Sequence, residues 1–545
     1  MTPEPDSPRG TLGRFLEDVV GRHGERPALR FGGEGFRYAD VERESRRLAK
    51  GLIGAGVVKG ARVALYMANR PEWVFAAFAV ARAGGVLVPV NTFAPPAERD
   101  YILRHSDASL LLLQPALLKH RFLAEIQADH PELAAGEPGR LRCPALPQLR
   151  RLACLGAGSW DELLALGEDV PDALLDAACA EVEPSDDAMI IYTSGTTAHP
   201  KGVLHAQRAP VLQGWRFAEL LRLAAEDRVW TSYPLFWTAG IAMSLGATFA
   251  AGGCLLLQEH FDPGEALAMI EGERATAVHA WPHQHQAMGE HPSLAGRDLS
   301  ALRKIEVSSP LAAQAGVRED AYGAGSSYGL SETFTIASMI PVDAPPELRR
   351  ATSGRPLPGM RIRIVDPQSG ALLPAGVEGE IALKGATFMR GYYKVLPERY
   401  LDEDGFFHTQ DGGSLDADGY LHWSGRISNL IKTGGANVSP VEIEQALAGF
   451  EGLRLGLPVG VPHPTLGEAI VLCAVASEGA DVDEARVRSF LRGRLAAYKV
   501  PRRILFFRAE ELAYTGSQKI QLGPLRDAAL ARLAAEHVEI DGHRY

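Results

Sequence analysis

The chain has 545 residues, of which 46% are hydrophobic and 23% are charged. A chain of this length predicts two to four compact units rather than one core, and this composition is typical of a soluble globular enzyme. The formal net charge of -11 at pH 7 disfavours nucleic acid as a partner and offers no polybasic patch to a membrane surface.

The cysteines and the N-terminus indicate the compartment. Five cysteines are scattered without C-x-x-C spacing, so the sequence predicts neither a disulfide framework nor a zinc site and fits a reducing cytoplasm. Residues 1–10 contain three prolines and no apolar core, which argues against an ordinary signal peptide. We therefore expect a cytoplasmic protein without an integral membrane segment.

The first part of the chain alternates strand and helix patterns. Residues 11–54 predict amphipathic helices around a short strand pair, and residues 61–67 predict a strand. Pro71 then opens a helix that is followed by a strand at residues 86–90. Residues 229–257 repeat this plan, so two doubly wound subdomains are expected.

One stretch within this repeat needs a membrane test. Residues 238–257 carry no charge and are about as long as a spanning helix. The stretch is rich in Gly and Ala and is broken at Gly252-Gly253, which favours a buried helix, a turn and a buried strand over a membrane span.

The later segments have other patterns. Residues 114–158 are rich in Pro, Gly and Arg and predict a connection over the surface. Alternating residues at 361–365 and 379–383 predict a small β subdomain, and the segment after Arg426 predicts a compact α+β unit. The expected fold class is therefore α/β, with a large N-terminal domain of two doubly wound subdomains plus a small β subdomain, and a small α+β C-terminal domain.

The most informative motif is Y-T-S-G-T-T-A-H-P-K-G at residues 192–202. It follows the apolar run 188–191, which predicts a buried strand, so its hydroxyls and glycines are expected on a loop at the end of that strand. Hydroxyl groups, close backbone approach at glycine and a lysine suit a polyphosphate better than a plain surface turn. The motif is not a Walker loop, because Pro200 stands where that loop has glycine and Gly202 where it has a hydroxyl.

This stretch resembles the T-S-G-T-T-G-x-P-K-G signature of the adenylate-forming superfamily, which includes acyl-CoA synthetases, adenylation domains of peptide synthetases and luciferases. Ala198 replaces the glycine of the signature. The resemblance implies that the following residues bind the phosphates of ATP: Thr193, Ser194, Gly195, Thr196, Thr197 and Lys201.

Y-G-L-S-E at residues 328–332 is similar to a second motif of that superfamily, Y-G-x-T-E. The resemblance implies that Tyr328 and Gly329 contribute to the nucleotide site, that Ser331 bonds the α-phosphate and that Glu332 binds Mg²⁺. One carboxylate is chemically sufficient, because Mg²⁺ also keeps water and phosphate ligands. The alternative is a buried structural glutamate with an arginine partner. A dinucleotide motif is excluded, because Tyr328 stands where its third glycine would be.

Two further stretches extend the resemblance. Thr409-Gln410-Asp411 is similar to the T-G-D motif, with Gln410 in place of glycine, and implies that Asp411 accepts hydrogen bonds from the ribose hydroxyls. The following stretch, residues 424–444, resembles the crossover into the C-terminal domain of the superfamily. It implies that Arg426 reaches the ribose and phosphate, and that Gly434 and Gly435 let the pantetheine arm of CoA pass.

The crossover also implies a hinge at Ser428, where relatives often have lysine or aspartate. A hinge needs tolerant backbone angles more than one particular side chain, so serine is compatible with it. The expected domains are then residues 1–427, which bind AMP, and residues 428–545, which turn between two catalytic poses.

Residues 512–520 resemble the last motif of the superfamily, L-P-x-T-x-x-G-K-I/V, with Ala513 in place of proline and Gln518 in place of glycine. The resemblance implies that Lys519 neutralises the charge that grows on the α-phosphate as the acyl-adenylate forms. Taken alone, a lysine on such a loop would be a solvated charge.

The remaining candidates are weaker. Trp237 falls where relatives have a histidine or an aromatic residue beside the acyl pocket, with plain core packing as the alternative. Three histidines at 279, 283 and 285 superficially suggest a metal, but Pro282 interrupts their helical spacing. The basic run from Arg486 to Arg503 could meet CoA phosphates or form a solvated helix face.

Together the motifs predict an acyl-CoA synthetase that uses ATP, Mg²⁺ and coenzyme A. The segment 233–240 lacks the aspartate with which amino-acid-activating relatives hold an α-amine, so the expected substrate is an apolar carboxylic acid that is not an amino acid. Two alternatives stay open, an acyl-AMP ligase that loads a carrier protein and a catalytically weak paralogue that only binds nucleotide. The oligomeric state is expected to be monomer or homodimer.

Overall fold

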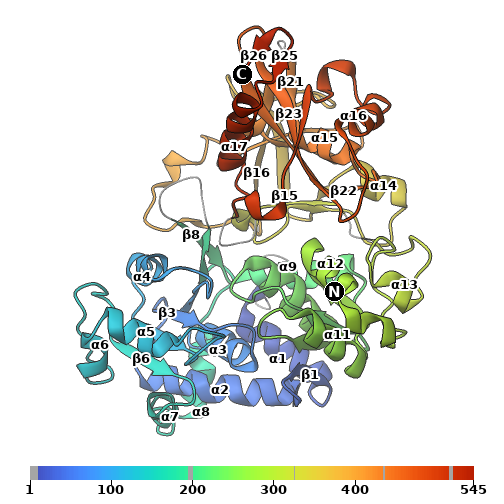
Figure 1. Ribbon diagram of the computed structural model, residues 1–545. Coiled ribbons are helices and arrows are strands. Elements are labelled where there is room, and N and C mark those ends of the chain that lie inside the picture. Colours follow the sequence, from blue (N-terminus) through green and yellow to red (C-terminus); the bar gives the residue numbers. More distant parts are fainter. Residues whose placement is uncertain (1–9, 194–199, 324–325, 434–435, 515–519) are drawn as a thin grey trace. The chain divides into compact units, whose positions relative to one another are not determined.

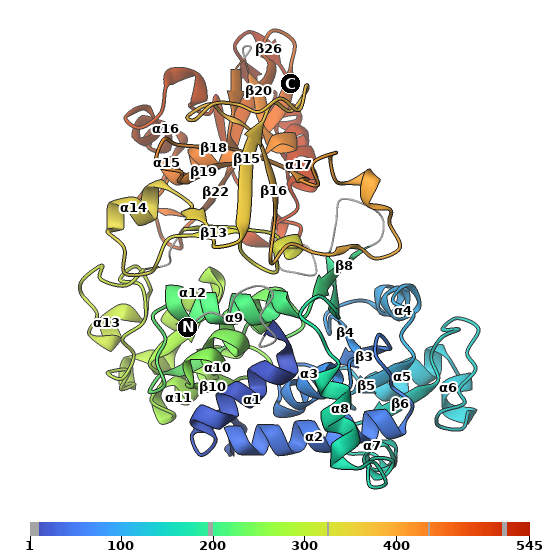
Figure 2. The same ribbon diagram turned by 180° about the vertical axis from the view of Figure 1, so that it is seen from behind.

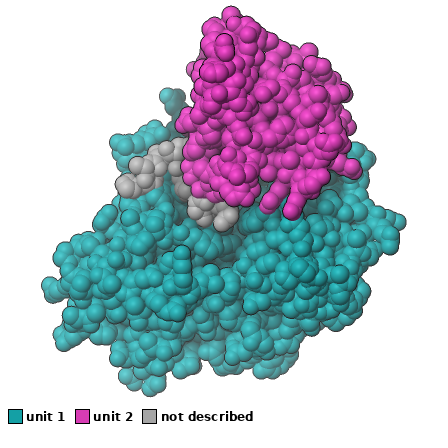
Figure 3. All heavy atoms as spheres, viewed as in Figure 1, with its two compact units in different colours: residues 1–361, 384–407 teal, residues 362–383, 408–545 magenta. Residues whose placement is uncertain are grey.

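The computed structural model describes residues 10–193, 200–323, 326–433, 436–514 and 520–545 (Figure 1). By packing, the chain divides into two compact units, which Figure 3 colours separately. Unit 1 comprises residues 1–361 and 384–407, and unit 2 comprises residues 362–383 and 408–545.

The first sheet of unit 1 has seven strands in the order β17-β8-β7-β4-β3-β5-β6. Its strands are β3 (Arg62–Tyr66), β4 (Val86–Pro89), β5 (Leu110–Leu113), β6 (Arg151–Cys154), β7 (Asp187–Thr193), β8 (Lys201–Ala206) and β17 (Gly391–Tyr392). The strands from β7 to β6 pair in parallel, whereas β8 is antiparallel to both β7 and β17. The connection from β3 to β4 is α3 (Pro71–Arg82), which begins at a proline as expected and is buried along its whole length.

The second sheet of unit 1 has the order β11-β9-β10-β1-β2. Its strands are β1 (Pro27–Phe31), β2 (Glu34–Arg37), β9 (Arg228–Thr231), β10 (Cys254–Leu257) and β11 (Ala277–His279). They pair in parallel except for β2. The two predicted doubly wound subdomains are thus confirmed.

The remaining helices of unit 1 surround these sheets (Figure 1). They are α1 (Leu12–His23), α2 (Tyr38–Gly54), α4 (Pro96–His105), α5 (Phe122–Asp129), α6 (Glu132–Ala135), α7 (Gly158–Ala165), α8 (Asp172–Ala180), α9 (Arg208–Leu220), α10 (Ala247–Ala251), α11 (Pro263–Gly272), α12 (Pro282–Glu290), α13 (Ala312–Ala315) and α14 (Pro346–Ala351). A third, small sheet consists of β12 (Ser327–Tyr328), β13 (Ser338–Met339) and β14 (Arg355–Pro356).

The uncharged stretch 238–257 folds as predicted. A π-helix (Gly240–Gly246) runs into α10, which ends at Gly252 with a left-handed φ of 76°, and β10 follows. Across the described residues, no helix combines the length and the apolar character that a membrane span requires.

The described part of unit 2 contains two larger sheets and a two-stranded one, which consists of β25 (Glu539–Ile540) and β26 (His543–Arg544). A four-stranded sheet has the order β15-β16-β18-β19, and its first two strands run side by side in Figure 2. The second sheet has the order β21-β20-β23-β22, with β24 on β23. The strands are β15 (Met360–Val365), β16 (Gly379–Gly385), β18 (Phe407–Leu415), β19 (Leu421–Arg426), β20 (Ile431–Thr433), β21 (Ala436–Val438), β22 (Leu453–His463), β23 (Gly467–Ala476) and β24 (Arg503–Phe506).

Three helices pack on the second sheet of unit 2 and give it an apolar core on both faces. They are α15 (Pro440–Ala446), α16 (Glu484–Arg492) and α17 (Leu522–Ala535). Val471 and Cys473 of β23 pack with residues of α17, whereas Ile470 and Leu472 pack with residues of α15 and α16. This alternation is that of a sheet covered on both sides, and it confirms the predicted compact α+β fold.

The structure corrects one segment and leaves one division open. Residues 114–158 are more than a surface connection, because they include α5, α6 and the edge strand β6. Their short apolar pieces, such as Phe122 and Ile126, are buried in the core beside β5. The division expected after residue 427 concerns motion and stays a prediction, whereas packing groups residues 408–427 with the C-terminal part.

Candidate functional site

The polyphosphate loop connects the ends of two antiparallel strands. β7 is buried at residues 188–191, and its last residue, Thr193, pairs with Lys201, the first residue of β8. Thr193 is half-buried and Lys201 is exposed. Ser194, Gly195, Thr196 and Thr197 lie outside the described residues, so their predicted roles stay predictions.

The Y-G-L-S-E motif forms a tight turn in unit 1. Tyr328 is buried in β12, and Ser331 and Glu332 follow in a short 3-10 helix (Ser331–Thr333). A Cβ atom at Gly329 would lie 2.1 Å from the carbonyl oxygen of Thr335, so the turn requires glycine there. The chain then passes through Phe334 with a φ of 50°.

Buried neutral groups hold this turn. The Nε2–H group of His205 donates to the carbonyl oxygen of Ser331 at 2.8 Å. Full burial lowers the pKa of His205 to about 3, so the imidazole is neutral at physiological pH. The side-chain amide of Gln213 donates to the carbonyl oxygens of Thr333 and Ile336 at 2.8 and 2.7 Å. Three backbone carbonyls around Glu332 are therefore fixed by side chains of β8 and α9.

Tyr392 joins two of the predicted site residues. Its hydroxyl donates to Glu332 Oε1 at 2.6 Å, and the Nζ atom of Lys201 lies 4.9 Å from the centre of its ring. The structural alternative for Glu332 is an arginine partner, but this hydrogen bond comes from a tyrosine. Sequence reasoning missed Tyr392, because it lies far from both motifs in the chain and becomes their neighbour only through the pairing of β17 with β8.

The carboxylate of Glu332 fits a hard cation. It is half-buried in a turn of fixed geometry, and it offers oxygen ligands of the kind that Mg²⁺ prefers. Glu332 would hold the cation, and Ser331 beside it would face the phosphate.

Trp237 lies in an aromatic group at the end of β9. It is half-buried and contacts Phe236 and Phe93 edge-on, with ring centres 5.2 and 6.2 Å apart. Phe93 is 52% exposed, so the group faces solvent on one side. This placement suits the wall of an apolar site better than a buried core.

Unit 2 contributes a charged pair. Asp411 of β18 is only 3% exposed, and its Oδ1 atom lies 2.9 Å from Nε of Arg426 on the paired strand β19. Arg426 also donates from Nη1 to the carbonyl oxygen of Thr409 at 2.9 Å. The antiparallel register of β18 and β19 thus brings the two predicted ribose residues together.

Gln410, which replaces a motif glycine, takes the conformation that glycine would favour. Its φ is 61°, and its backbone N–H donates to Glu380 Oε1 at 2.9 Å. The other oxygen of Glu380 lies 2.9 Å from Nδ1 of His408. The substitution therefore keeps the backbone shape of the turn.

The other predicted residues of the C-terminal part are Ser428, Gly434, Gly435 and Lys519. Ser428 lies in a 3-10 turn (Ile427–Asn429) directly after β19. Gly434, Gly435 and Lys519 lie outside the described residues. Their roles, and the hinge, stay predictions.

The weaker candidates have structural partners. Nδ1 of His279 lies 3.2 Å from Ser244 Oγ, and Nδ1 of His285 lies 3.0 Å from Ser309 Oγ. No cluster of potential metal ligands is found among the described residues. Pro282 begins α12 rather than interrupting it.

The basic run is engaged within unit 2. Lys499 bonds Glu442, Arg502 pairs with Asp541, and Arg503 pairs with Glu484.

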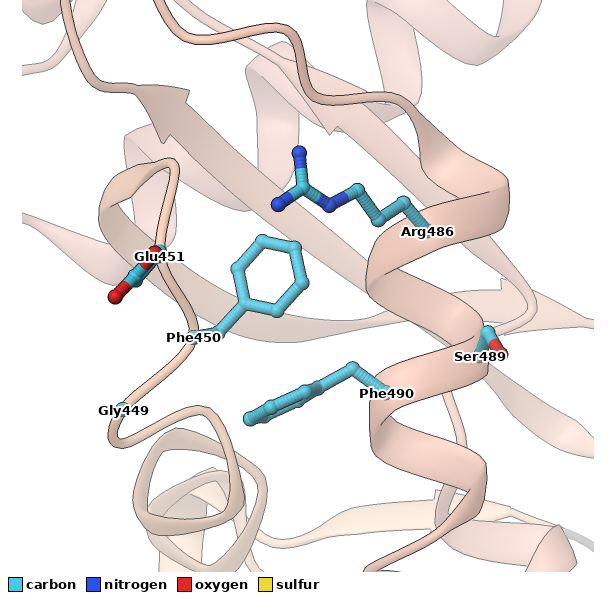
Figure 4. Close-up of a pocket in the computed structure, with 6 residues that line it drawn as sticks. All are labelled: Gly449, Phe450, Glu451, Arg486, Ser489 and Phe490. Atoms are coloured by element: carbon cyan, nitrogen blue, oxygen red, sulfur yellow. The ribbon is translucent and has the colours of Figure 1, made fainter.

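A cavity of about 500 Å³ lies between α16 and the loop before β22. Figure 4 shows its lining, which is Gly449, Phe450, Glu451, Arg486, Ser489 and Phe490. Arg486 is the first residue of the basic run, and none of the motif residues lines this cavity.

Comparisons with known proteins agree with this geometry. The model of the AMP-binding enzyme family matches residues 16–393, and that of the AMP-binding enzyme C-terminal domain matches residues 442–519. A feruloyl-CoA synthase from Amycolatopsis is 33% identical over 92% of this chain and 95% of its own length. An indoleacetate–CoA ligase from Aromatoleum aromaticum is 31% identical over 94% and 97%. The crystal structure of ATP-bound MatB from Rhodopseudomonas palustris matches with a TM-score of 0.76 and 27% identity, covering 95% of this chain and 98% of that one.

Proposed function

This chain belongs to the AMP-binding enzyme family and is an AMP-forming acid–thiol ligase, and from that premise we propose that it converts an apolar, non-amino-acid carboxylic acid into its CoA thioester through an acyl-adenylate. In the first half-reaction, a carboxylate oxygen attacks the α-phosphorus of ATP and pyrophosphate leaves. In the second, the CoA thiol gives its proton to solvent and its sulfur attacks the acyl carbon, and AMP leaves.

The observation that supports this proposal is that the charged motif residues in the described part are individually positioned. Glu332 is held by Tyr392, Lys201 lies over the same ring, and Asp411 is paired with Arg426. Glu332 is half-buried and Asp411 is buried, and such charges are costly to keep without a use or a partner. Their support is what a site that only positions and neutralises its substrates requires.

Each residue then has a role. Thr193, Lys201 and the loop between them bind the phosphates, Ser331 bonds the α-phosphate, and Glu332 holds Mg²⁺. Bound Mg²⁺ supplies neutralisation of phosphate charge. Asp411 accepts hydrogen bonds from the ribose hydroxyls, and Arg426, which pairs with Asp411, reaches the ribose and phosphate. Lys519 approaches the α-phosphate in adenylation, and the turn about Ser428 then exchanges it for Gly434 and Gly435 beside the pantetheine arm.

The acid is proposed from the group around Trp237. Phe93, Phe236 and Trp237 offer ring edges and faces but no charge, which suits an apolar acid. The named products of two similar enzymes, feruloyl-CoA and the CoA ester of indoleacetate, are both aromatic, so aryl-substituted acids are the first to try.

Two alternatives remain distinct. An acyl-AMP ligase that loads a carrier protein would release pyrophosphate without regard to CoA. A catalytically weak paralogue was suggested by three glycine replacements, at Ala198, Gln410 and Gln518. Gln410 no longer supports that reading, because its backbone takes the required left-handed conformation. Ala198 and Gln518 lie outside the described residues.

The test is release of pyrophosphate and AMP from Mg·ATP against a panel of carboxylic acids, with and without CoA. We expect AMP formation that requires both CoA and an apolar acid, and a loss of at least about a hundredfold in Lys519→Ala, because one charge on the transition state is lost. Pyrophosphate release that is indifferent to CoA would favour the carrier-protein ligase. ATP binding without turnover on any acid would favour the weak paralogue.

A further inference from the structure

A segment of unit 1 that belongs to none of the motifs connects two of them. In the segment 388–393, the backbone N–H of Met389 donates to the carbonyl oxygen of Glu332 at 2.7 Å. That of Tyr393 donates to Gly202 at 2.7 Å, and that of Arg390 donates to Leu204 at 2.8 Å. The same six residues are therefore hydrogen-bonded to the turn that carries Glu332 and to the strand that begins with Lys201.

The side chain of Tyr392 is fixed at the centre of this connection. It is 8% exposed, and its ring contacts Tyr400 and Phe407 edge-on, with centres 4.9 and 6.2 Å apart. Tyr392 pairs with Val203 in the sheet, so Lys201, two residues before Val203, lies diagonally across on the same face. The pairing of β17 with β8 thus brings the ring of Tyr392 to Lys201, and the neighbouring bond from Met389 brings its hydroxyl to Glu332.

The two contacts of Tyr392 are of different kinds. At 2.6 Å, the bond from its hydroxyl to Glu332 Oε1 has the length of a charge-assisted hydrogen bond. The ammonium group of Lys201 faces the ring, where a cation is attracted without being neutralised. Tyr392 thus contacts both charged residues, and only the bond to Glu332 fixes the direction of a charged group.

We propose that Tyr392 is a positioning residue, which acts through Glu332 by orienting its carboxylate toward Mg²⁺·ATP. This inference rests on the proposed role of Glu332. Tyr392 itself touches neither substrate nor cation. We therefore expect its effect in the metal coupling, which is the factor by which Mg²⁺ tightens nucleotide binding. Mg²⁺ tightens this binding only when the carboxylate of Glu332 is correctly oriented.

The neighbouring residue offers a matched control. Tyr393 carries the same hydroxyl on the same segment, but its hydroxyl donates to Asp107 at 2.8 Å, beside Lys394, and not to Glu332. Tyr393→Phe removes one hydroxyl from the same segment without touching Glu332. A purely structural role for Tyr392 predicts that both Tyr-to-Phe variants behave alike.

The experiment measures the dissociation constant of α,β-methylene-ATP, which cannot release pyrophosphate, from the full-length protein by calorimetry. Each variant is titrated once with excess Mg²⁺ and once with EDTA, and the ratio of the two constants is the metal coupling. Because this is a binding ratio, it does not depend on turnover. Thermal unfolding of each variant reports whether it is folded.

We expect Tyr392→Phe to lower the coupling roughly tenfold, the factor that corresponds to one charge-assisted hydrogen bond. Tyr393→Phe should keep the wild-type ratio, and Glu332→Gln should bring the ratio close to one. If Tyr392→Phe is not folded, Tyr392→His takes its place, because histidine also carries a ring with a hydrogen-bond donor. The logarithm of its metal coupling should be more than half of the wild-type value.

The outcomes separate the two claims. A normal ratio in Glu332→Gln, or a wild-type ratio of one, contradicts the metal role of Glu332 and with it that part of the proposed function. Loss of coupling in Glu332→Gln together with a normal ratio in Tyr392→Phe overturns the inference about Tyr392 alone. Equal losses in Tyr392→Phe and Tyr393→Phe would reduce Tyr392 to a structural residue.

Discussion

The turn that carries Glu332 in unit 1 and the left-handed bend at Gln410 within β18 of unit 2, here called the second turn, are held by different chemistry. Both pass through non-glycine residues with positive φ, Phe334 at 50° and Thr335 at 100° in one and Gln410 at 61° in the other. Neutral side chains, those of His205 and Gln213, bond the first turn. The carboxylate of Glu380 and the guanidinium of Arg426 bond the second.

This difference follows from burial. His205 and Gln213 have no exposed surface, where an ion would be costly and a neutral donor is sufficient. The side chain of Arg426 is 46% exposed, so it can remain charged at little cost while it bonds the second turn. The first turn should therefore depend on the integrity of the core, and the second on one buried carboxylate, that of Glu380, and one guanidinium that solvent can reach.

The strongest test of the first turn is Gln213→Leu. It keeps the apolar volume but leaves the carbonyl oxygens of Thr333 and Ile336 without their donor. We expect the free energy of unfolding to fall by about 2–5 kcal/mol, since two buried acceptors lose their bonds. Metal-dependent nucleotide binding should fall with it, because Glu332 lies within the loosened turn. Chemical denaturation and calorimetry measure the two effects.

Gln114→Leu is the control for that variant. Gln114 is equally buried in unit 1 and bonds the backbone at Ala68 and Ala116, far along the chain from the Glu332 turn. We expect a loss of stability of similar size with unchanged nucleotide affinity at a temperature where both variants are folded. Equal losses of affinity in the two variants would show that the turn responds to general destabilisation only.

A second prediction contrasts the two units by pH. In unit 1, burial lowers the pKa of His205 to about 3 and that of His279 to about 4, from 6.5. The unfolded chain therefore binds protons that the folded one does not, and unit 1 loses stability as the pH falls below about 6.5. In unit 2, burial raises the pKa of Glu444 from 4.5 to about 7, so unit 2 loses stability as the pH rises between these values.

One variant in each unit isolates the contribution of its titrating residue to the pH dependence of stability. Glu444→Gln should raise the unfolding temperature relative to wild type by a few degrees at about pH 8 and not at about pH 5. His205→Gln should compare more favourably with wild type at about pH 5 than at about pH 8, whatever packing it loses. Scanning calorimetry at both pH values checks the two signs. The same pH trend for both variants would contradict the contrast between the units.

The sequence predicts these two turns unequally. Strands and helices with clear periodicity are found near their expected places, because those signals are local. Tyr392 could not be predicted, since its contact with Lys201 depends on which distant strand lies beside β8. The sequence shows that glutamine replaces glycine at residue 410, but not that its backbone is left-handed and that its N–H donates to Glu380. In both cases the sequence does not show which residue lies across the sheet as the partner.

The smallest predicted effect is the sharpest test of the second turn. Gln410→Gly should raise the free energy of unfolding by about 0.5 kcal/mol, because relief of the left-handed strain slightly exceeds the added freedom of the unfolded chain. The bond from residue 410 to Glu380 uses the backbone, so nucleotide affinity should stay within about twofold of wild type. Chemical denaturation measures the free energy of unfolding, and calorimetry measures the nucleotide affinity.

A gain in affinity of tenfold or more would mean that the glutamine impairs nucleotide binding at this site, as the weak-paralogue alternative requires. A comparable loss would mean that its side chain contacts the nucleotide, a role that glycine at this position could not have.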